Sequence, residues 1–381
     1  MKPHNLCERV ALNKSARNIV VKIGSRLLTR NGLVDSQRIQ QLASQICRLS
    51  GQNRNVTLVS SGAVGTAMTL LNTDRPVGLG RLQAYAAIGQ AELIHHYNME
   101  FEKHGKRAAQ VLLTIDDMTH RQRYLNLRNT IFSLFELNAI PVINENDCVA
   151  TEEISLAFGD NDQLAAKVAM LVDADLLIIL SDVDGLYDRD PQDTRAKRIS
   201  FVQEVDLRIK DMVETKHQGQ SFSKGGMKSK INAAKIATSV GIPTIIAGGQ
   251  EPEILHTLIQ GNPVGTYFAA SEQSTNSRKR WIKSSIEITG KVIVDAGAEK
   301  AICEKQTSLL PIGAVEVHGA FNAGDLISVS NLDGRVIAKG ISNFDHLESK
   351  IVLGLHSNQL DEKLGRAVHE ELIHRDNLVL V

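Results

Sequence analysis

The stretch from Pro141 to Leu171 reads PVINENDCVATEEISLAFGDNDQLAAKVAML. It contains two similar polar clusters, NEND at 144–147 and GDND at 159–162, each after an apolar run. The run AIPVIN before NEND is typical of a buried strand, and DQLAAKVAMLV after GDND is typical of a helix. Because Asn and Asp favour turns, an exposed turn explains either cluster alone. Two clusters at the same end of one sheet would instead form a binding site for a small polar molecule.

Apolar β-branched runs and segments with helical spacing alternate on both sides of this stretch. The predicted strands are NIVVKIGS at 18–25, NVTLVSSG at 55–62, AAQVLLT at 108–114, DLLIILSDVDGLY at 175–187, IPTIIAGG at 242–249 and GTYF at 265–268. The predicted helices cover 36–50, with Asp35 or Ser36 as the cap, and 82–102, 123–138, 226–241 and 251–261. Such alternation predicts an α/β fold, an open and mainly parallel sheet flanked by helices.

Ligands of such sheets bind outside the carboxyl ends of the strands. Four groups of small or polar residues follow predicted strands: Lys22, Ser60–Gly62, Asn144–Asp147 and Ser181–Asp182. We expect them to converge on one edge of the sheet, which favours a binding site over unrelated turns.

The pattern changes after Phe268. The segment AASEQSTNSRKRWIKSS at 269–285 is polar and basic, and we interpret it as a linker between a first domain at 1–268 and a second at 286–381. Short strands separated by turns follow, namely KVIVDAG, AVEVHG, DLISVS, RVIAKG and the terminal DNLVLV. The second domain is therefore predicted to be small and β-rich.

Composition excludes several functional classes. The 381 residues include 43 Lys and Arg against 43 Asp and Glu, a balance that argues against a chain built mainly to bind nucleic acid or an anionic membrane. The four cysteines, Cys7, Cys47, Cys148 and Cys303, form no C-x-x-C pair, which fits a reducing cytoplasm. We find no signal-peptide pattern and no apolar run long enough to span a bilayer.

Three segments have features of a phosphate site, although the P-loop and the dinucleotide-binding fingerprint are both absent. Lys22 precedes Gly24 and Ser25 after a strand, SSGAVG at 60–65 joins a strand to a helix, and SKGGMKSK at 223–230 opens a helix. Each has a plain alternative: a surface charge, tight packing or a solvated helix start. However, lysines at a helix N-terminus oppose the helix dipole unless an anion is bound there. Together these parts predict phosphoryl transfer without a Walker motif.

These motifs, in this order and spacing, resemble the glutamate 5-kinase family of the amino acid kinase superfamily. The resemblance is carried by VVKIGS, VSSGAV, PVINENDCVATEE, GDNDQLAA, SDVDGLY, GGMKSK and GIPTIIA. The C-terminal segments SRKRWI, SLLPIG and GAFNAGDLISV are similar to the PUA domain of many bacterial members. The resemblance implies an amino acid kinase domain at 1–268 and a PUA domain at 286–381. It also implies ATP-dependent phosphorylation of the γ-carboxylate of L-glutamate in proline biosynthesis.

The same resemblance implies roles for individual residues. Ser61, Asp147 and Asn161 would contact glutamate, and Lys22, Lys230 and Asp162 would be catalytic, with Asp162 orienting the two lysines. The implied ATP-binding residues are Lys22, Ser181, Asp182, Lys224, Gly225, Gly226, Met227, Lys228, Ser229 and Lys230. Mg²⁺ would be held mostly by phosphates and water, and no protein ligand for it is identified.

The same resemblance also has implications for partners and for rival functions. The family implies a homo-oligomer and feedback inhibition by L-proline. Another amino acid kinase, such as one acting on N-acetylglutamate, is the nearest rival, and the combination of NEND with GDND argues against it. A PUA domain also leaves an RNA-binding protein as an alternative, which the balanced charge does not support.

Overall fold

The structure is a computed structural model that describes residues 13–30, 33–149, 161–191, 193–206, 209, 226–271, 288–356, 359–365 and 370–381. These residues form two units, one drawn from 1–274 and the other mainly from 275–381. The expected linker at 269–285 lies outside the described residues from 272 onward. None of the helices in the described ranges combines the length and apolar composition that a bilayer-spanning segment needs.

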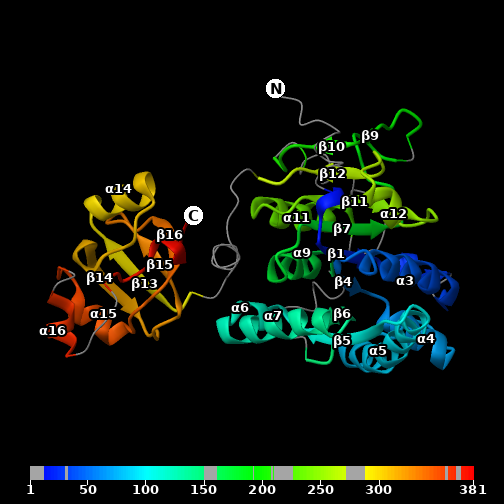
Figure 1. The fold of residues 1–381 in the computed structure, drawn as a ribbon, viewed down its shortest axis with the longest axis horizontal. Helices are drawn as coiled ribbons and strands as arrows, with labels where there is room; N and C mark the ends of the chain where they lie inside the picture. Colours follow the sequence, from blue (N-terminus) through cyan, green and yellow to red (C-terminus); the bar gives the residue numbers. More distant parts are fainter. Residues whose placement is uncertain are drawn as a thin grey trace. The chain divides into compact units, whose positions relative to one another are not determined.

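A large sheet forms the centre of the first unit (Figure 1). Its strand order is β10-β12-β11-β7-β1-β4-β6-β5, and every pairing from β11 to β5 is parallel, whereas β12 runs antiparallel to β11. The apolar β-branched runs predicted as strands are these strands, which confirms the α/β fold. The bounds are β1 (Asn18–Ile23), β4 (Asn55–Ser60), β5 (Arg107–Leu113), β6 (Ala139–Glu145), β7 (Leu176–Ser181), β10 (Phe201–Val202), β11 (Thr244–Gly248) and β12 (Thr266–Phe268).

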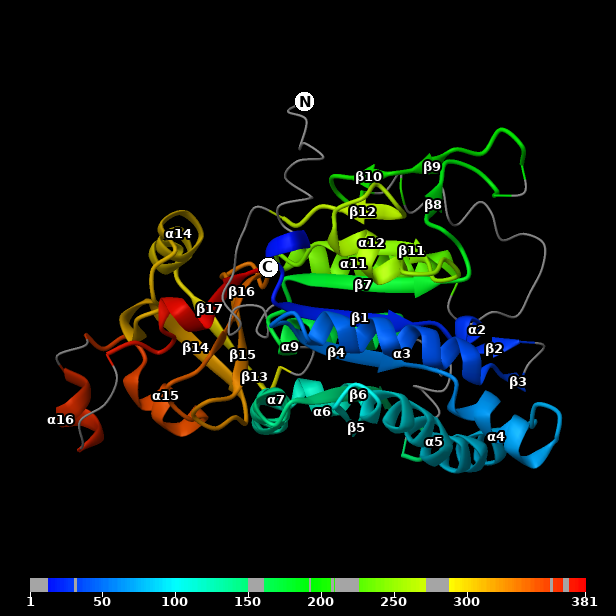
Figure 2. The same ribbon diagram turned by 45° about the vertical axis from the view of Figure 1, so that its right-hand side comes forward.

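Parallel pairing brings the carboxyl ends of these strands to one edge, as expected from the sequence. Ile23 at the end of β1 is in register with Ser60 at the end of β4, and Ser181 of β7 is in register with Gly248 of β11. At this edge α2 (Ser25–Leu28) follows β1 and α4 (Ala63–Leu71) follows β4 (Figure 2).

Helices cover both faces of the sheet (Figure 1). Alternate residues of β1, among them Ile19, Val21 and Ile23, join a core cluster with Ile39 and Leu42 of α3. The opposite face is covered by α9 and α11, which contact β1 and β11. The helix bounds are α3 (Ser36–Ser50), α5 (Leu79–Glu102), α6 (Ile115–Thr119), α7 (Arg121–Glu136), α9 (Asn161–Leu171), α11 (Met227–Ser239) and α12 (Ile254–Ile259).

Two predicted boundaries are settled by local geometry. Asp35 caps α3, because its side chain accepts a hydrogen bond from the backbone N–H of Arg38 at 3.0 Å. The segment 175–187, expected as one strand, is divided: β7 ends at Ser181, and β8 (Leu186–Tyr187) pairs with β9 (Arg198–Ile199) in a separate sheet. Gly185 has a φ of 146°, a conformation that a continuous strand of L-residues does not adopt.

The second unit contains its own sheet and core. The strand order is β14-β13-β15-β16-β17, formed by β13 (Gly290–Val294), β14 (Ala314–Gly319), β15 (Leu326–Ser330), β16 (Val336–Ile341) and β17 (Leu378–Leu380). This confirms the predicted β-rich domain. The helices α14 (Ala296–Lys305), α15 (His346–Val352) and α16 (Leu360–Leu364) were not predicted, and residues from each of them pack on its core.

Close packing of α5 on α4 depends on one glycine. A Cβ placed on Gly89 would lie 1.8 Å from the carbonyl oxygen of Ala63 and 2.6 Å from the backbone N of Ala67. These are backbone atoms at the start of α4, so they cannot move aside as a flexible side chain would. The small residue at 89 therefore sets how closely α5 approaches the edge of the sheet.

We expect Gly89→Ala to lower the midpoint of thermal unfolding by several degrees, measured by circular dichroism. Overpacking of a core costs about 1–3 kcal/mol, and 1 kcal/mol moves the midpoint by roughly 2–4 °C in a domain of this size. Gly80→Ala is the matched control in the same helix, because a Cβ there meets nothing within 4 Å. The control should be neutral or slightly stabilising, and equal midpoints for the two variants would contradict this account.

Candidate active site

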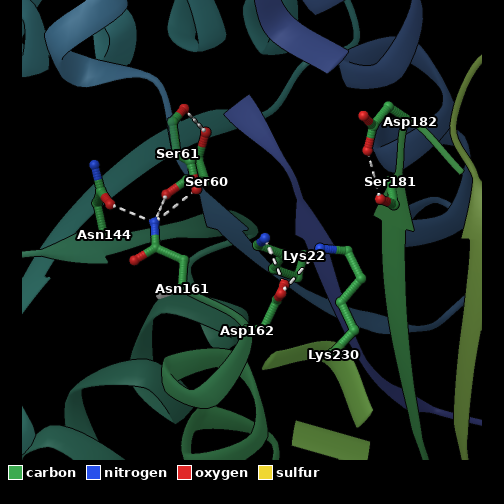
Figure 3. A network of polar contacts seen from close by, with 9 residues as sticks. All are labelled: Lys22, Ser60, Ser61, Asn144, Asn161, Asp162, Ser181, Asp182 and Lys230. Atoms are coloured by element: carbon green, nitrogen blue, oxygen red, sulfur yellow. Dashed lines mark hydrogen bonds and ion pairs between the residues drawn. The ribbon is translucent and has the colours of Figure 1, made fainter. Parts of the chain in front are cut away.

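A buried carboxylate between two lysines lies at the centre of the site (Figure 3). Lys22 Nζ is 2.5 Å from Asp162 Oδ1, and Lys230 Nζ is 3.1 Å from Asp162 Oδ2. The three residues come from β1, α9 and α11, and each is at most 5% exposed. Burial by itself raises the pKa of Asp162, but attraction to Lys22 and Lys230 outweighs it and holds that pKa below its usual range.

The charge of this triad suits an anionic ligand. Two ammonium groups and one carboxylate leave one net positive charge at the edge of the sheet. Gly24 is the first residue after β1, two positions beyond Lys22, and a Cβ at Gly24 would lie 3.9 Å from Lys22 Nζ. A phosphate group is the kind of ligand that such a cationic edge with nearby glycine backbone accommodates.

Asn161, next to Asp162 in the chain, anchors a second network (Figure 3). Its Nδ2 donates to the carbonyl oxygen of Ser60 at 2.7 Å, to Ser61 Oγ at 2.8 Å and to Asn144 Oδ1 at 2.9 Å. Asn161 is 3% exposed, and within the described part of the chain its Oδ1 has no hydrogen-bond partner. A buried acceptor without a partner is costly, so a donor group placed against Oδ1 would be favoured.

Asp147 lies in the turn after β6, close to the second network in sequence and half-buried. Burial, followed by the charge of Glu145, raises the pKa of Asp147 to about 7. The carboxyl group is therefore only partly ionised near neutral pH, and a bound cation would favour its ionised form. An α-ammonium group is a cation of suitable size.

Ser181 and Asp182 lie at the end of β7, on the other side of the lysines (Figure 3). Ser181 Oγ donates to Asp182 Oδ1 at 2.9 Å, and Arg26 donates to Asp182 Oδ2 at 2.8 Å. Asp182 is exposed, so this ion pair lies at the solvent side of the site. The residue pair is at the sheet edge where the sequence predicted it.

The predicted nucleotide segment is described only in part. Lys224 and Gly225 lie outside the described residues, as do Gly159 and Asp160 of GDND. Gly226 is the N-cap of α11, and Met227, Lys228 and Ser229 form its first turn, ahead of Lys230. Lys228 is exposed, and Met227 and Ser229 are half-buried. Lys230 of this segment is the lysine that pairs with Asp162 in the triad.

Three contributors to the site were not predicted from the sequence. Gln90 of α5 accepts from Asn144 Nδ2 at 2.7 Å, Tyr97 of α5 shares a hydrogen bond with Ser60 Oγ at 3.0 Å, and Arg26 of α2 pairs with Asp182. The only signal for Gln90 was a polar residue within the small apolar run AAIGQA at 86–91. Helical periodicity alone does not tell which strand end such a residue reaches.

Metal ligation is not apparent among the described side chains. No group of three or more His, Cys, Asp or Glu residues is placed to hold an ion there. Asp162 is committed to two lysines, so its chemistry does not fit a metal ligand.

Two known protein families match parts of this chain. The amino acid kinase family model matches residues 17–248, and the PUA domain model matches residues 290–364. A glutamate 5-kinase of Nitrosococcus oceani is 43% identical over 371 residues, which cover 97% of this chain and 98% of the relative. One of Methylobacillus flagellatus is 45% identical over 370 residues, covering 96% and 98%. The likeness extends through both units, and the chain belongs to the glutamate 5-kinase family.

Proposed function

We propose that this protein transfers the γ-phosphoryl group of ATP to the γ-carboxylate of L-glutamate, forming L-glutamyl 5-phosphate, the first step of proline biosynthesis. The observation that carries the proposal is the adjacency of Asn161 and Asp162. One residue anchors a polar network suited to an amino acid, and the next holds two lysines suited to phosphates. Family membership supports both the use of ATP and the choice of glutamate.

In the reaction, a γ-carboxylate oxygen attacks the γ-phosphorus, and the bond from that phosphorus to the bridging oxygen of ADP breaks. No proton needs to move, because the attacking carboxylate is already ionised. Two unit charges about 4 Å apart repel by roughly 4 kcal/mol at an effective dielectric constant near 20. Lys22 and Lys230 would offset this repulsion and stabilise the charge that develops on the transferring group. Asp162 would hold both ammonium groups in place before the substrates bind.

We assign the substrates to the two sides of the triad. Ser61, Asp147 and Asn161 would bind glutamate, with Asp147 facing the ammonium group. Ser181, Asp182 and the segment from Lys224 to Lys230 would bind ATP. Magnesium would arrive on the nucleotide, bound by phosphate oxygens and water, and when bound it neutralises phosphate charge.

Three further assignments accompany this function. L-proline shares the α-amino acid head of glutamate, so we propose that it inhibits at an overlapping site and competes with glutamate but not with ATP. A homo-oligomer is the assembly that the family favours. A cytoplasmic location fits Cys47, Cys148 and Cys303, which are free thiols.

The substrate assignment is tested with hydroxylamine, which traps an acyl phosphate as a hydroxamate. With Mg²⁺ and ATP, L-glutamate should give hydroxamate at a rate set by the enzyme concentration. N-acetylglutamate lacks the ammonium group that Asp147 would bind, so its kcat/KM should be at least about 100-fold lower. L-aspartate is too short to bring its side-chain carboxylate to the triad and should also react poorly. Equal rates with N-acetylglutamate would refute the assignment.

Removal of a triad lysine should depress kcat. We expect Lys22→Met and Lys230→Met each to lower kcat by about 100-fold or more, because the lost charge acts on the transition state. Lys167→Met is the matched control, since Lys167 is a partly buried lysine on the same helix as Asp162. Steady-state kinetics with both substrates varied measure the effect. A change confined to the KM for ATP would exclude the transition-state role.

The raised pKa of Asp147 predicts a pH dependence. The ionised carboxylate binds the ammonium group, so kcat/KM for glutamate should increase as pH rises through about 7. A single group with that pKa changes its ionised fraction about ten-fold between pH 6 and pH 8. Asp147→Asn should have a lower kcat/KM for glutamate without this rise, whereas kcat/KM for ATP at saturating glutamate is the internal control. Parallel profiles for wild type and variant would show that another group titrates.

A further inference from the structure

Gln90 reaches the site from a helix that contributes no residue to the predicted substrate or nucleotide contacts. It belongs to α5, is 6% exposed, and its Oε1 accepts from Asn144 Nδ2 at 2.7 Å. The neighbouring Gly89 permits this approach, because α5 packs there against the backbone at the start of α4. The contact joins residues 54 positions apart in the sequence.

The orientation of the three carboxamides follows from groups that have a single hydrogen-bonding role. A carbonyl oxygen only accepts, so Asn161 must present Nδ2 to the Ser60 carbonyl. A backbone N–H only donates, so Asn144 must present Oδ1 to the N–H of Glu145, at 2.9 Å. Asn144 Nδ2 then faces away from both, toward Gln90, and Gln90 must present Oε1 to it.

The chain of hydrogen bonds therefore runs from Gln90 through Asn144 to Asn161. If Asn144 turned over, its Nδ2 would face two other donors, Asn161 Nδ2 and the N–H of Glu145. The acceptor on Gln90 opposes that turn. It helps to keep Asn144 Oδ1 on Asn161 Nδ2, so that Asn161 Oδ1, which has no hydrogen-bond partner among the described residues, would face a donor of the ligand.

We propose that Gln90 is a positioning residue for glutamate binding, acting through Asn144 on the orientation of Asn161. The inference rests on the proposed function, because it takes Asn161 as a glutamate contact. Gln90 adds a restraint to those of the Ser60 carbonyl and the Glu145 N–H on which atom of Asn161 meets the substrate, and it need not touch the substrate itself.

A double-mutant cycle separates this role from direct contact and from general loosening. Gln90→Met keeps the length of the side chain and removes its acceptor, so we expect the KM for glutamate to rise about ten-fold, with the KM for ATP within about two-fold of wild type. In an Asn144→Ala background, where the relay is already broken, Gln90→Met should change the KM for glutamate by less than about two-fold. An equal increase in both backgrounds would overturn the proposal.

Gln45→Met is the matched control. Gln45 is also a buried glutamine, 4% exposed, and its carboxamide accepts from the N–H of Leu255 in α12, remote in sequence from the network of Asn161. Its replacement should lower thermal stability and leave the KM for glutamate unchanged. An equal effect of the two Met variants on that KM would show a structural role alone.

Two further variants keep the test decisive if Gln90→Met or Asn144→Ala does not fold. Gln90→Asn shortens the carboxamide by one methylene and should raise the KM for glutamate as Gln90→Met does. Asn161→Ala replaces Asn144→Ala as the background in which Gln90 has no further effect. An unchanged KM for glutamate in Asn161→Ala would refute the proposed glutamate site itself. A raised KM in Asn161→Ala together with an unchanged KM in Gln90→Met would refute only the positioning role.

Discussion

The ion pairs of Asp162 are the constraint on which the rest of the site depends. Two lysines with buried side chains repel each other and lose hydration, so neither is stable at this position without the carboxylate between them. Lys22 interrupts the apolar run of β1, and Asp162 at the start of α9 lies between it and Lys230 near the start of α11. The fold brings β1, α9 and α11 together, and the buried charges of the two lysines are stabilised because the Asp162 carboxylate lies between them.

The first turn of α9 then links two tasks. Asn161 and Asp162 are consecutive, so the backbone fixes the separation between the polar network at the ends of β4 and β6 and the cationic centre at the end of β1. In the proposed reaction this separation would set how far the amino acid head of glutamate lies from its reacting γ-carboxylate. A rigid helix end is well suited to positioning of this kind, on which phosphoryl transfer mostly relies.

The polar network proposed to bind glutamate is held in part by α5, a helix that belongs to none of the quoted sequence motifs. Gln90 and Tyr97 of this helix reach the ends of β6 and β4, and Gly89 sets how near the helix lies. The same close packing therefore serves stability and the geometry of the site.

From the sequence alone, periodicity predicted the main strands and helices of the first unit, its mainly parallel sheet, and the edge at which Lys22, Ser61, Asp147 and Ser181 would be found. These follow from local periodicity and from the rule that parallel strands end at a common edge, both of which are readable within short segments. Only the tertiary structure shows that Gln90 meets Asn144 and that Arg26 meets Asp182. The contact of Asp162 with both lysines was already expected from the family resemblance, and the structure adds its distances. The structure also divided the segment 175–187, where Gly185 leaves the strand conformation. Such contacts depend on how closely helices pack on a distant strand end, and no local pattern in the chain records that distance.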